Sequence, residues 1–253
     1  MMRTCVRPQM DRVRQADGSA DACAIVLAAG SGERFGDPRG KQFVELGGLP
    51  LVAWSVLAFD RAPSVGALVV VCPADRMDHM RHDVLDKLDL LHEVMLVRGG
   101  ATRQDSVFAG LTAVPEEYDL VAIHDGARPL VEQRDIERCL AAVRDDAKVV
   151  GAICAARVTD TIKIVDEERI CATADRSQLW SAQTPQVFDR RTIVAAHESA
   201  LLEGFVGTDD ASLIERRGGR VLVVETPRDN LKVTLPEDLA IAEAILEHRI
   251  GIG

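Results

Sequence analysis

Short apolar segments alternate with helix-like segments along most of this chain of 253 residues. Buried strands are expected where apolar runs are short and bounded by turn residues, at Ala24–Ala29, Ala67–Cys72, Glu93–Val97, Leu120–His124, Val149–Ala155 and Val221–Glu225. Helices are expected at Pro50–Phe59, Asp75–Leu88, Arg103–Val114, Arg134–Arg144, Ile193–Leu202 and Asp209–Arg216, and in a closing segment that begins at Pro236. Strands that alternate with helices of this length imply right-handed crossovers and a mainly parallel sheet.

One segment interrupts this alternation. Val158–Ala174 contains two β-prone stretches around the polar turn Asp166-Glu167-Glu168, which predicts a hairpin. We therefore expect an α/β fold, with a Rossmann-like, mainly parallel twisted sheet, helices on both faces and a projecting β-hairpin arm at about residues 156–177. Residues 22–253 should form a single domain, preceded by a disordered extension at 1–21.

The composition limits where the protein works and what it binds. A formal net charge of -10 at pH 7 argues against nucleic acid and anionic membranes as partners. No apolar run approaches the roughly 18 residues that cross a bilayer, and no secretory signal is evident, so we expect a cytoplasmic protein. Six scattered cysteines lack metal-ligand spacing and should be reduced, mostly core thiols, namely Cys5, Cys23, Cys72, Cys139, Cys154 and Cys171.

A glycine-rich loop, Leu27–Gly36, follows the first predicted strand directly. In an open parallel sheet, ligands bind at the carboxyl ends of strands, and small residues let backbone N–H groups approach a phosphate. The spacing fits neither a dinucleotide fingerprint, whose third glycine would come one residue earlier, nor a Walker A loop, which would need Ser or Thr at Gln42. Arg34 and Lys41 are cations of the same loop, so we expect them to hold a nucleotide triphosphate.

Further along the chain, several short blocks follow one another in a characteristic order. They are Leu27–Gly36, Gly40–Gln42, Gly99–Ser106, His124–Pro129, Asp160–Lys163, Arg176–Trp180, Thr184–Gln186, Thr208–Ser212 and Asp229–Thr234. In this order they resemble the sugar and alditol phosphate nucleotidyltransferases, and among these the 2-C-methyl-D-erythritol 4-phosphate cytidylyltransferases. The resemblance runs from about Ala24 to His248.

The resemblance implies transfer of CMP from CTP to 2-C-methyl-D-erythritol 4-phosphate, which yields 4-diphosphocytidyl-2-C-methyl-D-erythritol and pyrophosphate in non-mevalonate isoprenoid synthesis. It also implies Mg2+ as cofactor and a homodimer in which each arm reaches over the partner's active site. A cytidylyltransferase acting on ribitol 5-phosphate remains the alternative, because both acceptors are polyol phosphates. A second alternative, a non-catalytic nucleotide-binding module, conflicts with the presence of all the cations that the resemblance makes functional.

Roles for single residues follow from the same resemblance. Arg34 and Lys41 would stabilise the transition state at the α-phosphate, and Arg176 (from the partner) and Lys232 would hold the acceptor phosphate. Asp125 would be the magnesium ligand. Asp229 would be a weaker second ligand, and His124 is expected to be an ordinary packed histidine. The remaining predicted contacts with CTP and acceptor are Ala28, Ala29, Gly30, Gly100, Ser106, Gly126, Arg128, Thr161 and Thr184.

Overall fold

The computed structural model describes residues 20–30, 32 and 34–251. Its central sheet has seven strands, which in chain order are β1 (Ala22–Leu27), β4 (Val65–Cys72), β5 (Val94–Arg98), β6 (Leu120–Asp125), β7 (Gly151–Arg157), β10 (Trp180–Asp189) and β11 (Val221–Glu225). The spatial order is β11-β7-β10-β6-β1-β4-β5, and every neighbouring pair is parallel except those made by β10. The predicted fold class is therefore confirmed.

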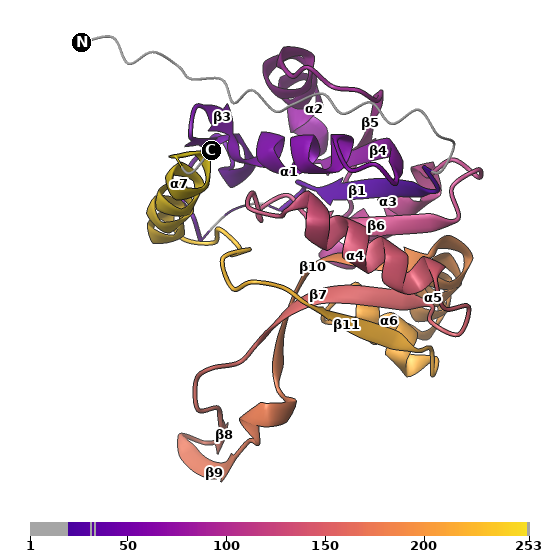
Figure 1. Cartoon of the computed structure of the whole chain (residues 1–253), viewed down its shortest axis with the longest axis vertical. Helices are drawn as coiled ribbons and strands as arrows, with labels where there is room; N and C mark the ends of the chain where they lie inside the picture. Colours follow the sequence, from indigo (N-terminus) through magenta and orange to yellow (C-terminus); the bar gives the residue numbers. More distant parts are fainter. Residues whose placement is uncertain (1–19, 31, 33, 252–253) are drawn as a thin grey trace.

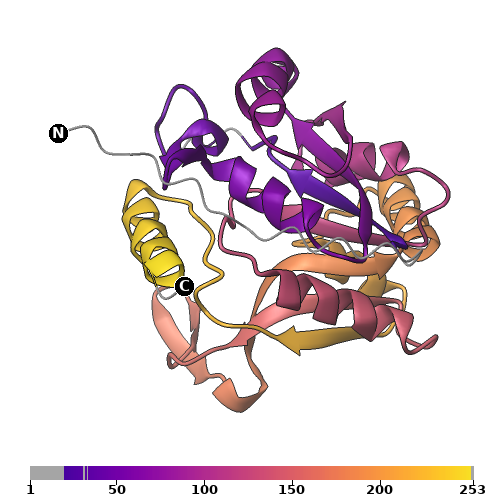
Figure 2. The ribbon, with the colours of Figure 1, turned by 45° about the horizontal axis from the view of Figure 1, so that its top comes forward.

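Helices cover both faces of this sheet (Figures 1 and 2). The core on one face includes α1 (Leu51–Asp60) and α4 (Gln133–Arg144). The core on the other face includes α3 (Arg103–Ala113), α5 (Arg190–Glu203) and α6 (Asp210–Arg216). Alternate residues of β1 enter the two cores, which is why its sequence is an unbroken apolar run.

A third, smaller core joins α7 (Pro236–Gly251) to the short hairpin of β2 (Glu45–Leu46) and β3 (Leu49–Pro50). Leu46 and Trp54 are buried there, and the Trp54 Nε1–H donates to the Leu46 carbonyl at 2.8 Å. Ala242 and Leu246 of α7 are buried in the same core, so the end of the chain lies beside the segment that follows the glycine-rich loop.

Strand β10 was not predicted, although it lies in the middle of the sheet. It runs antiparallel between β6 and β7, and its pairing with β7 skips from Ala182 to Gln186. Pro185 falls in this gap, where no N–H is needed for the ladder. The polar residues and the proline in Trp180–Asp189 argue against a central strand, so the sequence pattern did not predict the observed structure.

The prediction of one regular helix over Asp75–Leu88 is wrong. The chain instead makes a 3-10 turn (Ala74–Arg76), one α-helical turn, α2 (Met77–His79), a π-helical turn (Met80–Val84) and another 3-10 turn (Leu85–Lys87). Met80, Val84 and Leu85 are all buried in the core beside α1. Tertiary packing of these side chains therefore outweighs a regular helical repeat in this segment.

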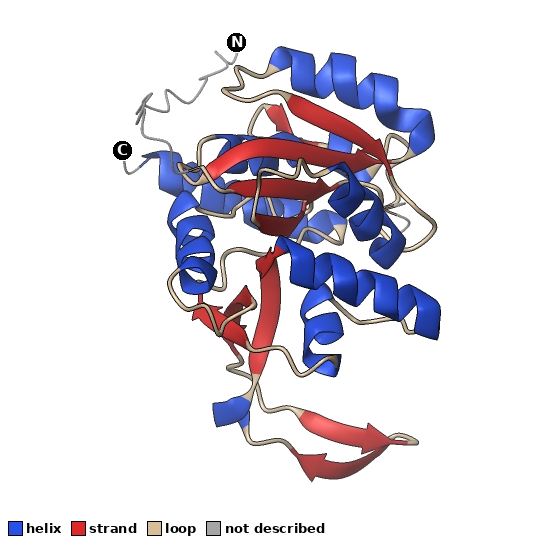
Figure 3. Ribbon diagram, turned by 90° about the vertical axis from the view of Figure 1, so that its right-hand side faces the viewer, coloured by secondary structure: helices blue, strands red, loops and turns tan. Residues whose placement is uncertain are grey.

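The predicted hairpin is present as β8 (Lys163–Asp166) and β9 (Arg169–Thr173), which project from the body as an arm (Figure 3). Every residue of both strands is exposed. The turn residues Glu167 and Glu168 have φ angles of 44° and 67°, which is the left-handed conformation that a two-residue hairpin turn requires.

The described cysteines agree with the expectation of free, mostly buried thiols. Cys23, Cys72, Cys139 and Cys154 are buried and free, and Cys171 is exposed on the arm. Burial raises the pKa of the Cys23 thiol to about 12 and that of Cys72 to about 11. Cys5 lies outside the described residues.

The predicted disordered extension falls almost entirely on residues 1–19, which lie outside the described part of the chain. Within its last two residues, the Asp21 carboxylate accepts from the Arg144 Nε–H at 2.7 Å, so ordered structure begins just before β1. None of the helices in the described ranges combines the length and the apolar character that a membrane span requires.

Candidate active site

The strand order reverses next to β1, where β4 and β5 lie on one side and β6 on the other. Leu27, at the end of β1, pairs with Asp125, at the end of β6. Crevices at such reversal points are where open α/β sheets bind ligands. A cavity of about 760 Å³ opens there, and it is lined by Leu27, Ala28, Ala29, Gly30, Gly32, Arg34, Lys41, Gln42, Leu51, Gly100, Ala101, Thr102, Arg103, Ser106, Asp125, Gly126, Ala127, Lys232 and Thr234.

The loop after β1 brings two cations to the cavity. Gly32 and Gly40 have φ angles of +67° and +92°, so the chain turns there in a conformation that favours glycine. Lys41 then begins a short 3-10 helix whose next two residues are buried, which anchors the loop against α1. Arg34 and Lys41 both line the cavity, as the sequence predicted.

Positive charge accumulates around Lys41. Burial is the largest cause of a lowered Lys41 pKa, and the nearby charges of Lys232 and Arg34 lower it further, while Asp125 raises it. Burial and neighbouring cations disfavour the charged form of Lys41, so an anion that enters the cavity stabilises that charged form. The cavity is therefore electrostatically suited to a polyphosphate.

Asp125 is the carboxylate at the centre of this cluster. Its Oδ2 accepts from the Lys232 Nζ at 2.7 Å, and its Oδ1 accepts from the Arg103 Nε at 3.3 Å. Burial raises the pKa of Asp125, but the charges of Arg103 and Lys232 outweigh burial and hold the pKa well below its usual range. Asp125 is thus a carboxylate anion at every working pH.

Arg103 is a cavity residue for which the sequence predicted no role. Its Nη1 lies 2.8 Å from Oδ2 of Asp210, a carboxylate that is 2% exposed at the start of α6. Burial lowers the pKa of Arg103, whereas Asp210 and Asp125 raise it more strongly, so the guanidinium stays charged. The sequence signal was present in the Gly99–Ser106 block, but Arg103 was interpreted there only as the start of a helix.

The backbone of Asp125 is held by a buried chain of hydrogen bonds. His124 contacts the Arg128 carbonyl through Nε2 at 3.2 Å, so this nitrogen carries the proton and donates it. Its Nδ1 then accepts from the Thr184 hydroxyl at 3.1 Å, and that oxygen accepts from the Asp125 N–H at 3.0 Å. Burial lowers the pKa of His124 to about 4, so the ring is neutral, and His124 is the packed histidine that was predicted.

The opposite wall is formed by the start of α3. Thr102 caps this helix by accepting from the Asp105 N–H at 3.1 Å. Ser106 donates its hydroxyl to the Thr102 carbonyl at 2.9 Å and accepts from the Gly100 N–H at 3.1 Å. Gly100 and Ser106, which are predicted substrate contacts, therefore also shape this wall.

The structure gathers most of the predicted site residues but not all of them. Those that line the cavity are Ala28, Ala29, Gly30, Arg34, Lys41, Gly100, Ser106, Asp125, Gly126 and Lys232. Those outside its lining are Arg128, Thr161, Arg176, Thr184 and Asp229.

Two of the five residues outside the lining belong to the arm. Thr161 and Arg176 are exposed, and the Arg176 Nη1 donates to the Thr159 carbonyl at 2.8 Å. Their predicted contacts with the acceptor remain predictions.

The other three residues make contacts within the body of the protein. Arg128 donates from Nη1 to the Asn230 carbonyl at 2.8 Å, and Thr184 holds Asp125 as described. Asp229 pairs with Arg249, with Oδ2 2.7 Å from Nη2. The roles predicted for these residues in binding phosphate, acceptor and metal also remain predictions.

Comparisons with known proteins agree with this geometry. The family described as 2-C-methyl-D-erythritol 4-phosphate cytidylyltransferase matches residues 22–248. The chain is 42% identical to the member from Geobacter metallireducens, over 90% of this chain and 98% of that protein. It is 45% identical to the member from Syntrophotalea carbinolica, over 88% of this chain and 95% of that protein.

A solved structure from Anaerococcus prevotii, described as a 4-diphosphocytidyl-2C-methyl-D-erythritol synthase, superimposes with a TM-score of 0.80 at 31% identity. The match covers 90% of this chain and 99% of that one. The family resemblance expected from the ordered motifs is thus confirmed over nearly the whole chain. This chain belongs to the 2-C-methyl-D-erythritol 4-phosphate cytidylyltransferase family.

Proposed function

We propose that the protein transfers CMP from CTP to 2-C-methyl-D-erythritol 4-phosphate, forming 4-diphosphocytidyl-2-C-methyl-D-erythritol and releasing pyrophosphate. The observation that carries this proposal is the convergence of Arg34, Lys41, Lys232 and Asp125 on one cavity at the reversal point of the sheet. Family membership over residues 22–248 supplies the identity of both substrates.

The reaction requires little proton chemistry from the protein. The acceptor phosphate has a second pKa near 6, so at neutral pH its oxygen is already largely ionised and can attack the α-phosphorus of CTP in line. Catalysis then consists of positioning and of stabilising the negative charge that develops on the transferring group. We assign stabilisation to Arg34 and Lys41, and binding of the acceptor phosphate to Lys232 with Arg176.

Asp125 fits a magnesium ion. Mg2+ commonly takes one or two carboxylates together with waters and substrate phosphates. The described residues contain no group of three His, Cys, Asp or Glu side chains placed to hold a metal, so we propose a site of this open kind. The bound ion would neutralise charge on the triphosphate. Asp229 is a weaker second ligand, because it lies outside the lining of the cavity and its carboxylate pairs with Arg249 at 2.7 Å.

We further propose a homodimer in which each arm serves the partner's cavity. Ile164, Val165 and Ile170 on the arm are 55%, 54% and 62% exposed, and a two-stranded hairpin that buries nothing is marginally stable. A partner subunit would cover these side chains and would receive Arg176 and Thr161. Five described cysteines without a disulfide also fit a reducing compartment, so we propose a cytoplasmic enzyme.

Pyrophosphate release, measured for four nucleoside triphosphates with each of two acceptors, tests the function. We expect the highest rate with CTP and 2-C-methyl-D-erythritol 4-phosphate in the presence of magnesium. A higher rate with ribitol 5-phosphate would replace the proposed acceptor by the alternative one. No pyrophosphate with any pair would favour a non-catalytic nucleotide-binding module.

A further inference from the structure

The segment between β11 and α7, residues 226–235, carries Lys232 but has no regular secondary structure. Even so, the Lys232 Nζ lies 2.7 Å from Oδ2 of Asp125. A lysine side chain is long and flexible, so only a firmly held backbone confines its charge to a small region. The side chains that hold this backbone therefore matter for the placement of Lys232.

Asn230 is the first of these side chains, and it is 2% exposed. Its Nδ2 donates to the Thr184 carbonyl at 3.0 Å and to Oε1 of Gln183 at 3.1 Å. Because a carbonyl can only accept, the amide nitrogen of Asn230 must face Thr184. Both amide protons of Asn230 thus bond to residues of β10. Asn230 itself lies two residues before Lys232 in the chain.

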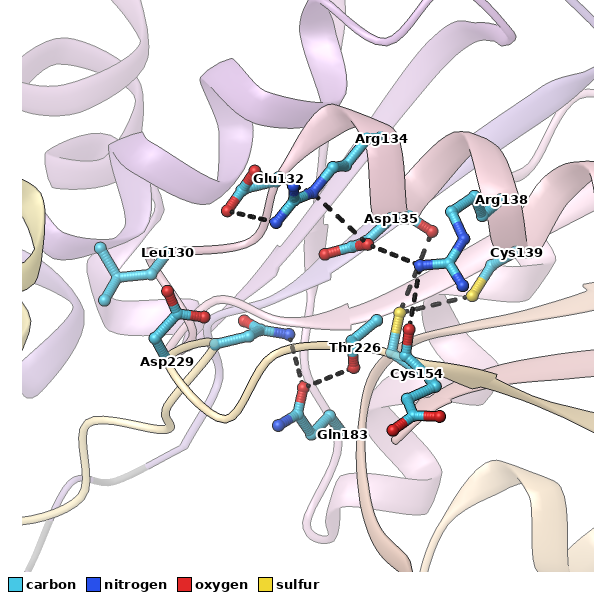
Figure 4. A network of polar contacts seen from close by, with 12 residues as sticks. Leu130, Glu132, Arg134, Asp135, Arg138, Cys139, Cys154, Gln183, Thr226 and Asp229 are labelled. Carbon is cyan, nitrogen blue, oxygen red and sulfur yellow. Dashed lines mark hydrogen bonds and ion pairs between the residues drawn. The ribbon is translucent and has the colours of Figure 1, made fainter. Parts of the chain in front are cut away.

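Gln183 is the second, and it is 5% exposed. Its Oε1 accepts from Asn230 and also from the Thr226 hydroxyl at 3.1 Å (Figure 4). Its Nε2 donates to the Pro227 carbonyl at 3.3 Å. One buried amide thus binds the segment at three successive places, Thr226, Pro227 and Asn230.

The start of the segment is also fixed to α4 (Figure 4). Arg138 donates from Nη1 to the Glu225 carbonyl at 2.9 Å, and the same guanidinium nitrogen lies 3.3 Å from Oδ1 of Asp135. The segment is therefore held to the body before it reaches Asn230.

The same two residues of β10 hold both members of the Lys232–Asp125 pair. The Thr184 hydroxyl accepts from the Asp125 N–H at 3.0 Å, while the Thr184 carbonyl and the Gln183 side chain hold Asn230. The Gln183–Thr184 backbone is consequently connected to both Lys232 and Asp125, and this connection sets the distance between the lysine and the carboxylate. Neither Asn230 nor Gln183 is among the residues that line the cavity.

We propose that Asn230 and Gln183 are positioning residues that hold Lys232 at the distance from Asp125 at which it binds the acceptor phosphate. This inference rests on the proposed function and adds two residues to it that touch no substrate. Buried amides serve this role well because their donors and acceptors have fixed directions, and leaving one partner unsatisfied is costly.

Steady-state kinetics on Asn230→Leu, Lys232→Ala and the double variant test the proposal. The leucine side chain has nearly the shape of asparagine but cannot donate. We expect kcat/KM for the acceptor to fall about 100-fold, the cost of a displacement of about 1 Å, while equilibrium binding of CTP stays within about threefold. In the Lys232→Ala background, Asn230→Leu should lower kcat/KM by about threefold at most, because there is no lysine left to position.

The contacts of Gln183 supply a second pair of variants in case Asn230→Leu does not fold. Thr226→Val removes only the hydroxyl that donates to Gln183, whereas Gln183→Met removes the contacts with Thr226, Pro227 and Asn230 together. The first variant should retain most of the kcat/KM for the acceptor, and the second should lose about as much as Asn230→Leu.

Asp60→Asn is the matched control. Asp60 is fully buried and anchors another loop by accepting from the Leu91 and His92 N–H groups, away from the cavity. It should lower the melting temperature without changing kcat/KM for the acceptor. The proposal is overturned if the losses from Asn230→Leu and Lys232→Ala multiply in the double variant, or if CTP binding falls as much as kcat/KM. Inactivity of the wild-type protein would instead contradict the proposed function.

Discussion

The cavity at the end of β1 and the arm formed by β8 and β9 are built in opposite ways. In the cavity, Asp125 is 12% exposed and both of its oxygens have cationic partners from the same chain. On the arm, every strand residue is exposed, including Ile164 and Ile170. Apolar side chains gathered on an exposed surface mark a contact with another molecule. The comparison teaches that one chain supplies both cationic partners of Asp125, whereas the arm leaves its apolar side chains uncovered, which is why we propose a partner for the arm alone.

The largest expected effect concerns the cavity alone. Lys41→Ala removes a cation that would stabilise the transferring phosphoryl group, and loss of one such donor lowers the rate about 10²- to 10³-fold. CTP binding should change by no more than about an order of magnitude, because Arg34 and the backbone remain. Single-turnover rates and equilibrium CTP binding measure the two effects separately.

Arg39→Ala is the control for Lys41→Ala, since Arg39 belongs to the same loop but pairs with Asp37 at 2.8 Å outside the cavity lining. It should leave both quantities unchanged. Normal turnover by Lys41→Ala would remove Lys41 from the catalytic residues.

The next effect decides whether the arm serves its own cavity or the partner's. Arg176→Ala should lower kcat/KM for the acceptor about 100-fold, because a charged phosphate contact is lost. When Arg176→Ala and Lys41→Ala subunits are mixed and reassorted, about half of the dimers should be mixed, and each mixed dimer has one site with both residues intact. Activity should therefore return to about a quarter of the wild-type value.

The mixing experiment has a clear contrary outcome. If each arm served its own cavity, every site in the mixture would lack either Lys41 or Arg176, and no activity would return. Affinity capture of one variant through a tag, with detection of the untagged variant in the captured fraction, shows whether subunits exchange, so a failed exchange is not confused with that outcome.

The same comparison explains how much the sequence could predict. Apolar runs and helical spacing predicted the sheet, its helices and the hairpin, because these depend on local periodicity. They did not predict β10, because Pro185 interrupts a strand whose neighbours β6 and β7 supply the remaining pairing. Pairing between distant segments leaves no local pattern in the strand itself.

The site residues also divide into those that the sequence predicted and those whose contacts it could not predict. Arg34, Lys41 and Asp125 could be predicted, because they directly follow predicted strands or lie in a glycine-rich loop. The direction of a side chain could not be predicted, and Thr184 and Arg128 bind backbone groups of Asp125 and Asn230. Asn230 lies in the Asp229–Thr234 block, but its role could not be predicted, since its partner Gln183 lies 47 residues away in sequence.

A third prediction concerns His124, which is buried next to Asp125, whereas the strand residues of the arm are exposed. The buried His124 has a pKa of about 4 when folded, because burial disfavours the imidazolium, against about 6.5 when unfolded. Protonation therefore favours the unfolded state. Stability from this residue is complete above about pH 6.5 and is lost as the pH falls toward 4, by up to about 3 kcal/mol.

Urea unfolding between pH 7 and pH 4 measures this loss. His124→Gln keeps a donor for the Arg128 carbonyl but cannot titrate, so its free energy of unfolding should depend less on pH across this window. His82→Gln, which replaces an exposed histidine that pairs with Asp86 at 2.9 Å, should leave the wild-type slope in place. An unchanged slope in His124→Gln would contradict a buried neutral imidazole.

The smallest effect concerns the tip of the arm. Glu167 and Glu168 both have positive φ angles, a conformation that residues other than Gly, Asn and Asp rarely adopt. Replacing the pair by Asn-Gly should stabilise the hairpin by about 1 kcal/mol without altering a contact in the cavity. Hydrogen exchange of the β8 and β9 amides should slow, whereas kcat/KM for CTP should stay the same. A large change in kcat/KM for the acceptor alone would mean that the tip itself reaches the partner's substrate, which would extend the arm's role beyond Arg176 and Thr161.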